Sequence, residues 1–127
     1  MVGAASPGTL DLTVSGVRSA KGTLRLCITR DPANFPRCVD DQRAITRNVP
    51  ANAPHLTLTG MATGDWAVAL IHDENDNRKL DTFAGIPREG FAFSRNPPLG
   101  FGAPRFDAAR FPVSGEAQQT LRMRYLL

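Results

Sequence analysis

Apolar and polar residues alternate along much of this chain, and that period of two restricts the fold more than any other feature of the sequence. In the segment TLDLTVSG, Leu10, Leu12 and Val14 occupy one set of alternate positions, and threonine and aspartate occupy the other. The segments TLRLCIT, HLTLTG and TLRMRYLL repeat the pattern. Because side chains of a β-strand point alternately to opposite faces, each segment is predicted to be a strand with one buried face.

One further segment, DWAVALIHD, is apolar at consecutive positions, which predicts a central strand that is covered on both faces. Trp66 is in phase with Val68 and Leu70, so we expect it in the core. His72 ends the segment, and we expect a hydrogen-bonded structural histidine there. Weaker strands are predicted in RAITRNV and ARFPVSG, the latter at an edge because of its proline.

Turn-forming residues separate these segments at short intervals, and no helical period of ten or more residues is present. The pattern predicts a single all-β domain, an antiparallel β-sandwich of immunoglobulin-like type with about seven strands. The length of 127 residues suits one domain. We expect residues 9–127 to form it and residues 1–8 to be flexible, like the start of an exported chain whose signal peptide has been removed.

Charge and hydropathy argue against nucleic-acid binding and against a transmembrane segment. The formal net charge is only +3, and the arginines are scattered singly, which is not the footprint of a nucleic-acid-binding protein. No stretch approaches the roughly 20 apolar residues of a transmembrane segment. Nothing in the sequence indicates an oligomeric state.

The two cysteines, Cys27 and Cys38, lie eleven positions apart without the spacing of a zinc site. Cys27 is out of phase with the inward leucines of its strand, and the loop RDPANFPRC that follows could fold back over that outer face. We therefore predict a disulfide and an oxidising compartment, periplasmic or extracellular. The alternative is two free thiols in a reducing compartment.

The loop HDENDNRKLD, residues 72–81, carries oxygen-bearing side chains at every second position. Calcium-binding loops present ligands at positions 1, 3, 5, 7 and 9, which predicts a calcium site. The predicted ligands are Asp73, Asn75, Asn77, the carbonyl of Lys79, Asp81 and, from a later loop, Glu89. Arg78 at position six and Ala84 at position twelve depart from the EF-hand pattern. The alternative is a polar turn whose carboxylates are neutralised by Arg78 and Lys79.

A segment rich in Gly, Pro and Phe spans residues 82–105 and does not alternate. Loops of this length inside a compact domain are often functional. Its phenylalanines, Phe83 among them, are expected to pack over one sheet or to line a pocket. The predicted ligand-binding residues are Phe91, Phe93 and Phe101.

Several segments, in this order, resemble a bacterial family of uncharacterised exported proteins, domain of unknown function 2141. They are LDLTVSGVRSAKGTLRLCIT, NFP, GDWAVALIHDENDNRKLD, GIPREGFAFSRN and FGAPRFDAARFPV. The resemblance implies an immunoglobulin-like or transthyretin-like sandwich, usually behind a signal peptide, and no established activity. Family members tend to have glycine where this chain has Asp76 and Arg78. If those positions are left-handed, Asp tolerates them moderately and Arg poorly.

Three functions compete. A hydrolase would use paired carboxylates from the loop at residues 72–81 and the segment after it, namely Asp73, Glu74, Asp76, Asp81 and Glu89. A purely structural envelope protein would have a filled phenylalanine cluster. Because no nucleophile motif, phosphate loop or zinc set is present, we assign no catalytic residue. We expect a non-enzymatic extracytoplasmic binding or accessory module, whose partner is a small ligand or an envelope protein.

Overall fold

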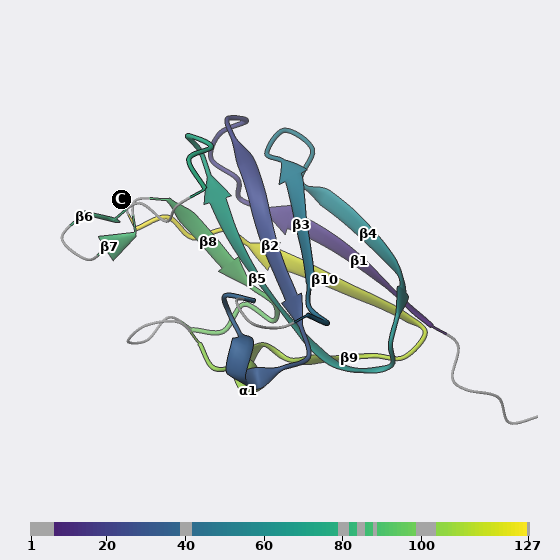
Figure 1. The fold of residues 1–127 in the computed structure, drawn as a ribbon. Coiled ribbons are helices and arrows are strands. Elements are labelled where there is room, and N and C mark those ends of the chain that lie inside the picture. Colours follow the sequence, from purple (N-terminus) through teal and green to yellow (C-terminus); the bar gives the residue numbers. More distant parts are fainter. Residues whose placement is uncertain are drawn as a thin grey trace, which may run out of the picture.

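Two β-sheets pack face to face in the computed structural model, which describes residues 7–38, 42–78, 82–83, 86–87, 89–98 and 104–126 (Figure 1). The three-stranded sheet has the order β10–β1–β4, and the five-stranded sheet has the order β3–β2–β5–β8 with β9 also paired to β5. Their bounds are β1 Gly8–Ser15, β2 Thr23–Thr29, β3 Ile45–Pro50, β4 His55–Met61, β5 Gly64–Asp73, β8 Gly90–Phe93, β9 Phe111–Val113 and β10 Glu116–Arg122. The predicted all-β sandwich is confirmed. The expectation of one long loop over residues 82–105 is wrong in part, because β8 lies within that segment and pairs with β5.

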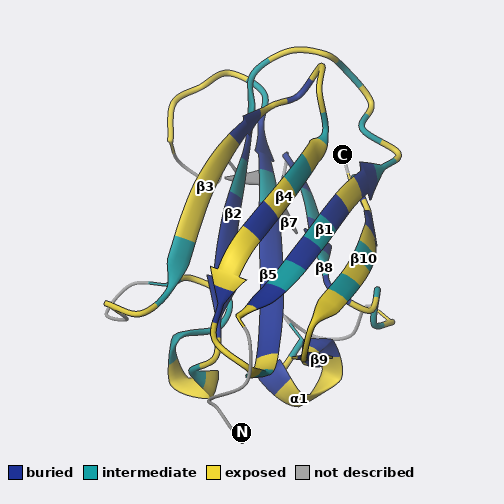
Figure 2. Ribbon diagram, turned by 90° about the vertical axis from the view of Figure 1, so that its right-hand side faces the viewer, coloured by how far each residue is buried: buried dark blue, intermediate teal, exposed yellow. Residues whose placement is uncertain are grey.

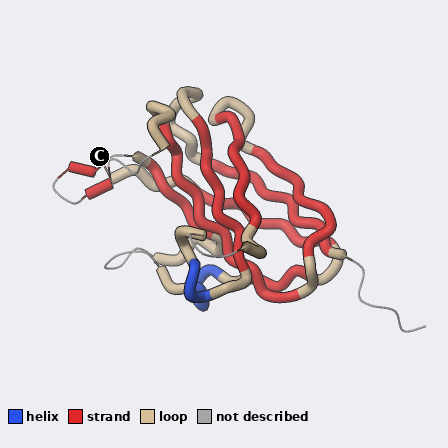
Figure 3. The backbone as a smooth tube through the Cα atoms, in the orientation of Figure 1, coloured by secondary structure: helices blue, strands red, loops and turns tan. Residues whose placement is uncertain are grey.

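Short elements complete the described chain. Two-residue strands β6 (Thr82–Phe83) and β7 (Ile86–Pro87) pair with each other. A 3₁₀ helix η1 (Pro32–Asn34) and a single-turn helix α1 (Phe106–Ala109) lie at one end of the sandwich (Figure 3). No helix in the described part of the chain is long and apolar enough to cross a membrane.

The pairing of β10 with β1 is parallel, with Thr9 opposite Glu116 and Ser15 opposite Arg122. We expected an antiparallel sandwich throughout, so this pair is a correction. Its cause is the connection: β9 pairs with β5 in the other sheet, and the chain turns through Gly115 directly into β10. No hairpin joins β10 to β1, and antiparallel geometry is obligatory only where a tight hairpin connects the strands.

Burial follows the alternation of the sequence (Figure 2). Along β1, buried and partly exposed residues alternate, whereas β5 is buried over most of its length. The core between the sheets includes most of the residues predicted to point inward, which are Leu10, Leu12, Val14, Leu24, Leu26, Ile28, Leu58, Trp66, Val68, Leu70, Leu121 and Met123. Leu56 and Tyr125, which were also predicted to point inward, are only partly buried against it. Both the central position of β5 and the core position of Trp66 are confirmed.

Polar groups after β8 close one side of the sandwich. The Asn96 side chain donates to the Thr120 carbonyl at 2.8 Å and accepts the Arg122 N–H at 2.7 Å, as a neighbouring strand would. Phe91 and Arg124 exchange two backbone hydrogen bonds of 3.0 and 2.9 Å. These bonds fix β8, and therefore the side chains of its outer face, against the other sheet.

Candidate functional site

The outer face of the five-stranded sheet brings together most of the described residues that the sequence singled out. Phe93 lies opposite Ala69 and Phe91 opposite Ile71 where β8 pairs with β5. On the other side of β5, Cys27 lies opposite Ala69 and Arg25 opposite Ile71. Directly opposed residues share a face, so these six side chains form one surface. Residues 73–78, which belong to the loop HDENDNRKLD and which we call the acidic loop, lie at one end of this surface. The loop that carries Cys38 lies at the other end.

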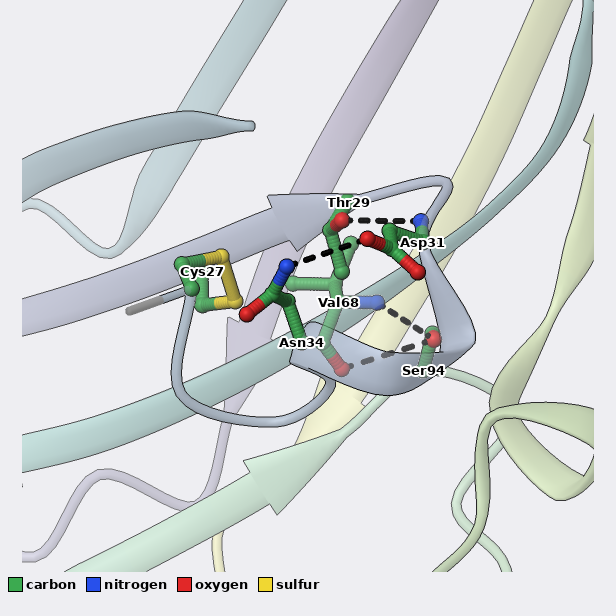
Figure 4. Close-up of a disulfide and its surroundings, with 7 residues drawn as sticks. Cys27, Thr29, Asp31, Asn34, Val68 and Ser94 are labelled. Atoms are coloured by element: carbon green, nitrogen blue, oxygen red, sulfur yellow. Dashed lines mark hydrogen bonds between the residues drawn. A yellow bond between two sulfur atoms is a disulfide. The ribbon is translucent and has the colours of Figure 1, made fainter. Parts of the chain in front are cut away.

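The disulfide loop, residues 30–38, folds back over the outer face as predicted, and Cys27 is bonded to Cys38 with their Cα atoms 5.7 Å apart (Figure 4). Polar side chains shape the loop between the cysteines. The Thr29 hydroxyl accepts the Asp31 N–H at 2.9 Å, and the Asp31 carboxylate accepts the Ala33 N–H at 3.0 Å, which caps η1. The predicted disulfide is confirmed and is consistent with an oxidising, extracytoplasmic compartment.

Three partly exposed phenylalanines, which we call the aromatic strip, cross the outer face. They are Phe91, Phe93 and Phe35. The ring centroids of Phe91 and Phe93 are 5.9 Å apart, and those of Phe93 and Phe35 are 6.1 Å apart. Phe35 also meets the buried ring of Phe106 edge-on at 6.2 Å. These spacings are typical of favourable aromatic pairs.

Two of the three predicted ligand-binding residues, Phe91 and Phe93, are therefore neighbours. Phe101 lies outside the described residues, as does the side chain of Phe83. Sequence reasoning missed Phe35. The signal was present, because Phe35 belongs to the loop that was expected to fold over Cys27.

A buried serine holds α1 beneath the strip. The Ser94 hydroxyl accepts the Val68 N–H at 2.9 Å and donates to the Ala109 carbonyl at 2.6 Å. It is fully buried, so these bonds are not exchanged with water. The contact places Phe106 and Ala109 over Ala67 on β5.

The acidic loop begins at Asp73, whose carboxylate is 1% exposed and accepts three hydrogen bonds. Its Oδ2 accepts from Arg25 Nε and from the Arg78 N–H, both at 2.8 Å, and its Oδ1 accepts from the Asn77 N–H at 3.2 Å. Burial alone would raise the pKa of Asp73, but these donors outweigh it and the pKa lies below its usual value. The neutralising guanidinium is that of Arg25 on β2, whereas Arg78 contributes its backbone N–H.

Other described residues of this region accept hydrogen bonds from neighbouring groups. Asn75 Oδ1 accepts the Asn77 N–H at 3.3 Å, and Asp76 Oδ1 accepts the Thr23 hydroxyl at 2.6 Å. Glu89 is buried, and its carboxylate accepts the Glu74 N–H at 3.0 Å. Of the six predicted metal ligands, Lys79 and Asp81 lie outside the described residues. Among those described, no three His, Cys, Asp or Glu side chains are grouped to hold a metal ion.

Two non-glycine residues of the loop have left-handed backbone angles. Asp76 has φ of 53° and Arg78 has φ of 62°. These are the two positions at which the resembling family usually has glycine, so the condition stated from the sequence is met at both. Arg at such an angle is strained relative to glycine.

A hydrogen-bonded chain supports the loop from the other side. Arg18 pairs with the Glu74 carboxylate, which also accepts the Ser19 hydroxyl at 3.0 Å. The hydrogen bond from Arg18 lowers the pKa of Glu74, against the smaller opposing effect of burial. The Arg18 guanidinium lies 4.4 Å from the centre of the Tyr125 ring, and burial raises the pKa of Tyr125.

His72 occupies the buried end of this chain. Its Nδ1 lies 2.8 Å from the Tyr125 hydroxyl, and its Nε2 donates to the Lys21 carbonyl at 2.7 Å. The predicted structural histidine is therefore confirmed. A Cβ at Gly90 would lie 2.3 Å from the Tyr125 ring, so only glycine leaves room for that ring beside β8. Sequence reasoning did not foresee this cluster, because its members come from widely separated segments.

Comparison with known proteins gives one match. Residues 12–121 match the model of a family described as "Uncharacterized protein conserved in bacteria (DUF2141)". The searches of curated proteins and of solved structures returned no significant match. The family match spans most of the chain and agrees with the resemblance drawn from its motifs. This protein, a disulfide-bonded β-sandwich, therefore belongs to the DUF2141 family of uncharacterised bacterial proteins.

Proposed function

We propose that this protein is a non-enzymatic binding module of the periplasm or cell exterior, and that it docks an apolar segment of an envelope protein on the aromatic strip. The observation that carries the proposal is the row formed by Phe91, Phe93 and Phe35, all partly exposed on one sheet face. Aromatic side chains are enriched at protein interfaces and dominate their binding energy. A strand face fixed by a disulfide at one end offers that row with little ordering cost.

The shape of the surface favours a protein partner over a small ligand. Small-molecule sites are concave. Neither Phe91 nor Phe93 lines the grooves of about 830 and 430 Å³ found elsewhere on the protein. An aromatic row outside these grooves instead suits a partner that packs its own apolar side chains against the three rings.

The state of the carboxylates argues against the hydrolase alternative. A general acid needs a raised pKa, whereas the pKa values of Asp73 and Glu74 are lowered by hydrogen bonds from Arg25 and Arg18, respectively. Both groups are therefore ionised near neutral pH and serve as acceptors for the loops around them.

Site-specific photo-crosslinking in intact cells tests the proposal. Benzoylphenylalanine would replace Phe91 in one variant and the exposed Gln118, on the outer face of the other sheet, in a matched control. We expect a discrete protein adduct at position 91 but not at 118. The adduct partner, once purified, should bind Phe93→Ser at least about tenfold more weakly than the unchanged protein. Adducts at both positions, or equal affinity for Phe93→Ser, would refute docking on the strip.

Calcium binding by the acidic loop is the second candidate, and it stays a prediction. Arg78 provides the sharp left-handed turn at the sixth loop position, where EF-hands use glycine. Opposing this, Arg25 already pairs with Oδ2 of Asp73, so calcium would have to displace that guanidinium.

Thermal unfolding with millimolar calcium, and with magnesium as the control, tests this candidate in the unchanged protein and in Arg25→Met. A calcium site predicts a selective rise in Tm that is larger in Arg25→Met, because the competing cation is gone. Equal Tm values with and without calcium in both proteins would identify the loop as a polar turn.

A further inference from the structure

A groove of about 830 Å³ opens at the end of the sandwich where β2 ends and β5 begins. Its lining includes Arg30 and Pro32 from the disulfide loop, Arg43 before β3 and Phe106 from α1. None of the three aromatic-strip residues lines it. The volume falls within the usual range for sites that bind small organic molecules.

Arg30 is held in place at this groove by packing. Its guanidinium carbon lies 5.2 Å from the centre of the Trp66 ring, and Trp66 itself is buried and donates to the Ala62 carbonyl at 2.9 Å. The Arg30 side chain also passes over Gly64, whose φ of 148° is one that other residues rarely adopt. Stacking on an aromatic face orients a guanidinium while leaving its N–H donors available.

Arg30 has no carboxylate partner in the part of the chain that the structure describes. The two acidic residues of the groove lining have other partners. Asp31 accepts from Ala33 and Asn34, and Asp65 pairs with Arg110 at 2.9 Å.

The groove also offers apolar surface beside this cation. Phe106, which is 8% exposed, and the exposed Pro32 of the disulfide loop both line the groove. We infer that the groove binds a small amphipathic anion, with a carboxylate or sulfonate on Arg30 and its apolar body against Phe106 and Pro32. Arg43 also lines the groove. This site goes beyond the proposed docking function, since it uses a different surface and a different class of ligand.

A pair of fluorescent probes tests the inference. Anilinonaphthalene sulfonate is an aromatic anion, and N-phenyl-1-naphthylamine has the same rings without the sulfonate. We expect Arg30→Gln to weaken binding of the anionic probe roughly tenfold, since a charge-assisted contact is lost, and to leave binding of the neutral probe nearly unchanged. Arg47→Gln is the matched control, because Arg47 is exposed on β3 and outside the groove lining.

The same experiment contains the results that would overturn the inference. If Arg30→Gln and the unchanged protein bound the anionic probe with equal affinity, Arg30 would not contact the bound anion and the inference would be wrong. An equal loss in Arg47→Gln would show general attraction to a basic surface. The Gly64 amide resonance should shift on titration with the anionic probe, and a constant resonance would place the probe elsewhere. Unaltered Tm of Arg30→Gln excludes misfolding, and Phe93→Ser separates the groove from the aromatic strip because it should keep the anionic response.

Discussion

The two loops at the ends of the outer face are held to the same strand by different chemistry. The disulfide loop is bonded covalently through Cys27, and the acidic loop is held by the ion pair between Asp73 and Arg25. Arg25 and Cys27 are two residues apart on β2, so their side chains share the outer face. One strand thus anchors both loops, one through a bond that depends on redox conditions and one through a contact that depends on pH.

This difference teaches which conditions each end of the face responds to. A disulfide is stable across the ordinary pH range and persists where the compartment is oxidising. A carboxylate that is buried under an arginine keeps its loop only while it is ionised. Phe91 and Phe93 lie between these two loops, whereas Phe35 belongs to the disulfide loop. We therefore expect reduction to disturb the Phe35 end of the aromatic strip and acid to disturb the opposite end.

Removal of the disulfide should have the largest effect. Cys27→Ala with Cys38→Ala removes a cross-link between positions eleven residues apart, and the chain-entropy model gives a loss of about 3 kcal/mol in the free energy of unfolding. Urea unfolding at neutral pH measures the loss, and the unchanged protein under reducing conditions is the control and should lose a similar amount. A loss below about 1 kcal/mol would mean that the packing of Phe35 and the hydrogen bonds of Thr29 and Asp31 hold the loop without the disulfide.

Loss of the ionic anchor should cost less. Arg25→Met keeps the apolar stem but leaves the buried Asp73 with only backbone donors, which should cost about 2 kcal/mol. The matched control is Arg47→Met on β3, where an exposed arginine should matter by less than about 0.5 kcal/mol. Equal effects of the two substitutions in urea unfolding would show that the pair between Arg25 and Asp73 adds no more stability than an exposed arginine does.

Acid should weaken the ionic end selectively. The folded-state pKa values of Asp73 and Glu74 are lowered, so the unfolded chain binds more protons than the folded protein in acid. The free energy of unfolding therefore decreases as the pH is lowered. Their contribution is complete above the unfolded values near 4 and is lost progressively as pH falls below them. Urea unfolding from pH 7 to pH 3 should show this slope.

Two variants separate the ends of the face in that experiment. Arg25→Met should flatten the pH dependence, since the hydrogen bond that most strongly lowers the pKa of Asp73 is gone. The cysteine double variant should keep the slope of the unchanged protein at a lower stability throughout. The opposite assignment, with the slope lost in the cysteine variant, would contradict the comparison.

The sequence predicted the disulfide end better than the ionic end, and the reason is physical. Alternation states which face each side chain takes, so an outward Cys27 followed by a short returning loop was enough to pair it with Cys38. The partner of Asp73 depends on which strand lies beside β5. Arg25 is far from Asp73 in the sequence, and only the register of β2 against β5 brings them together. Proximity in sequence pointed instead to Arg78.

The same limit explains the other differences. A period of two does not distinguish parallel from antiparallel neighbours. The parallel pairing of β10 with β1 therefore could not be predicted from the alternation. Phe106 packs over Ala67 on β5 from the single-turn helix α1, in a segment whose sequence does not alternate. Faces are local properties of a strand, whereas neighbours are properties of the topology.

The smallest expected effect is a gain in stability at the ionic end. Arg78→Gly removes a side chain from a residue with φ of 62° and keeps the N–H that Asp73 accepts. Relief of left-handed strain, partly offset by the greater freedom of glycine in the unfolded chain, should add about 0.5 to 1 kcal/mol.

Asp76→Gly is the matched variant for that gain, because Asp76 has a similar φ of 53° but also accepts from Thr23. It should therefore gain less than Arg78→Gly in urea unfolding. A loss of stability in Arg78→Gly would show that the arginine side chain, rather than its backbone N–H, holds the turn. A gain would instead mean that Arg25 and the backbone N–H groups suffice to hold Asp73, and that the left-handed angle of Arg78 strains this loop.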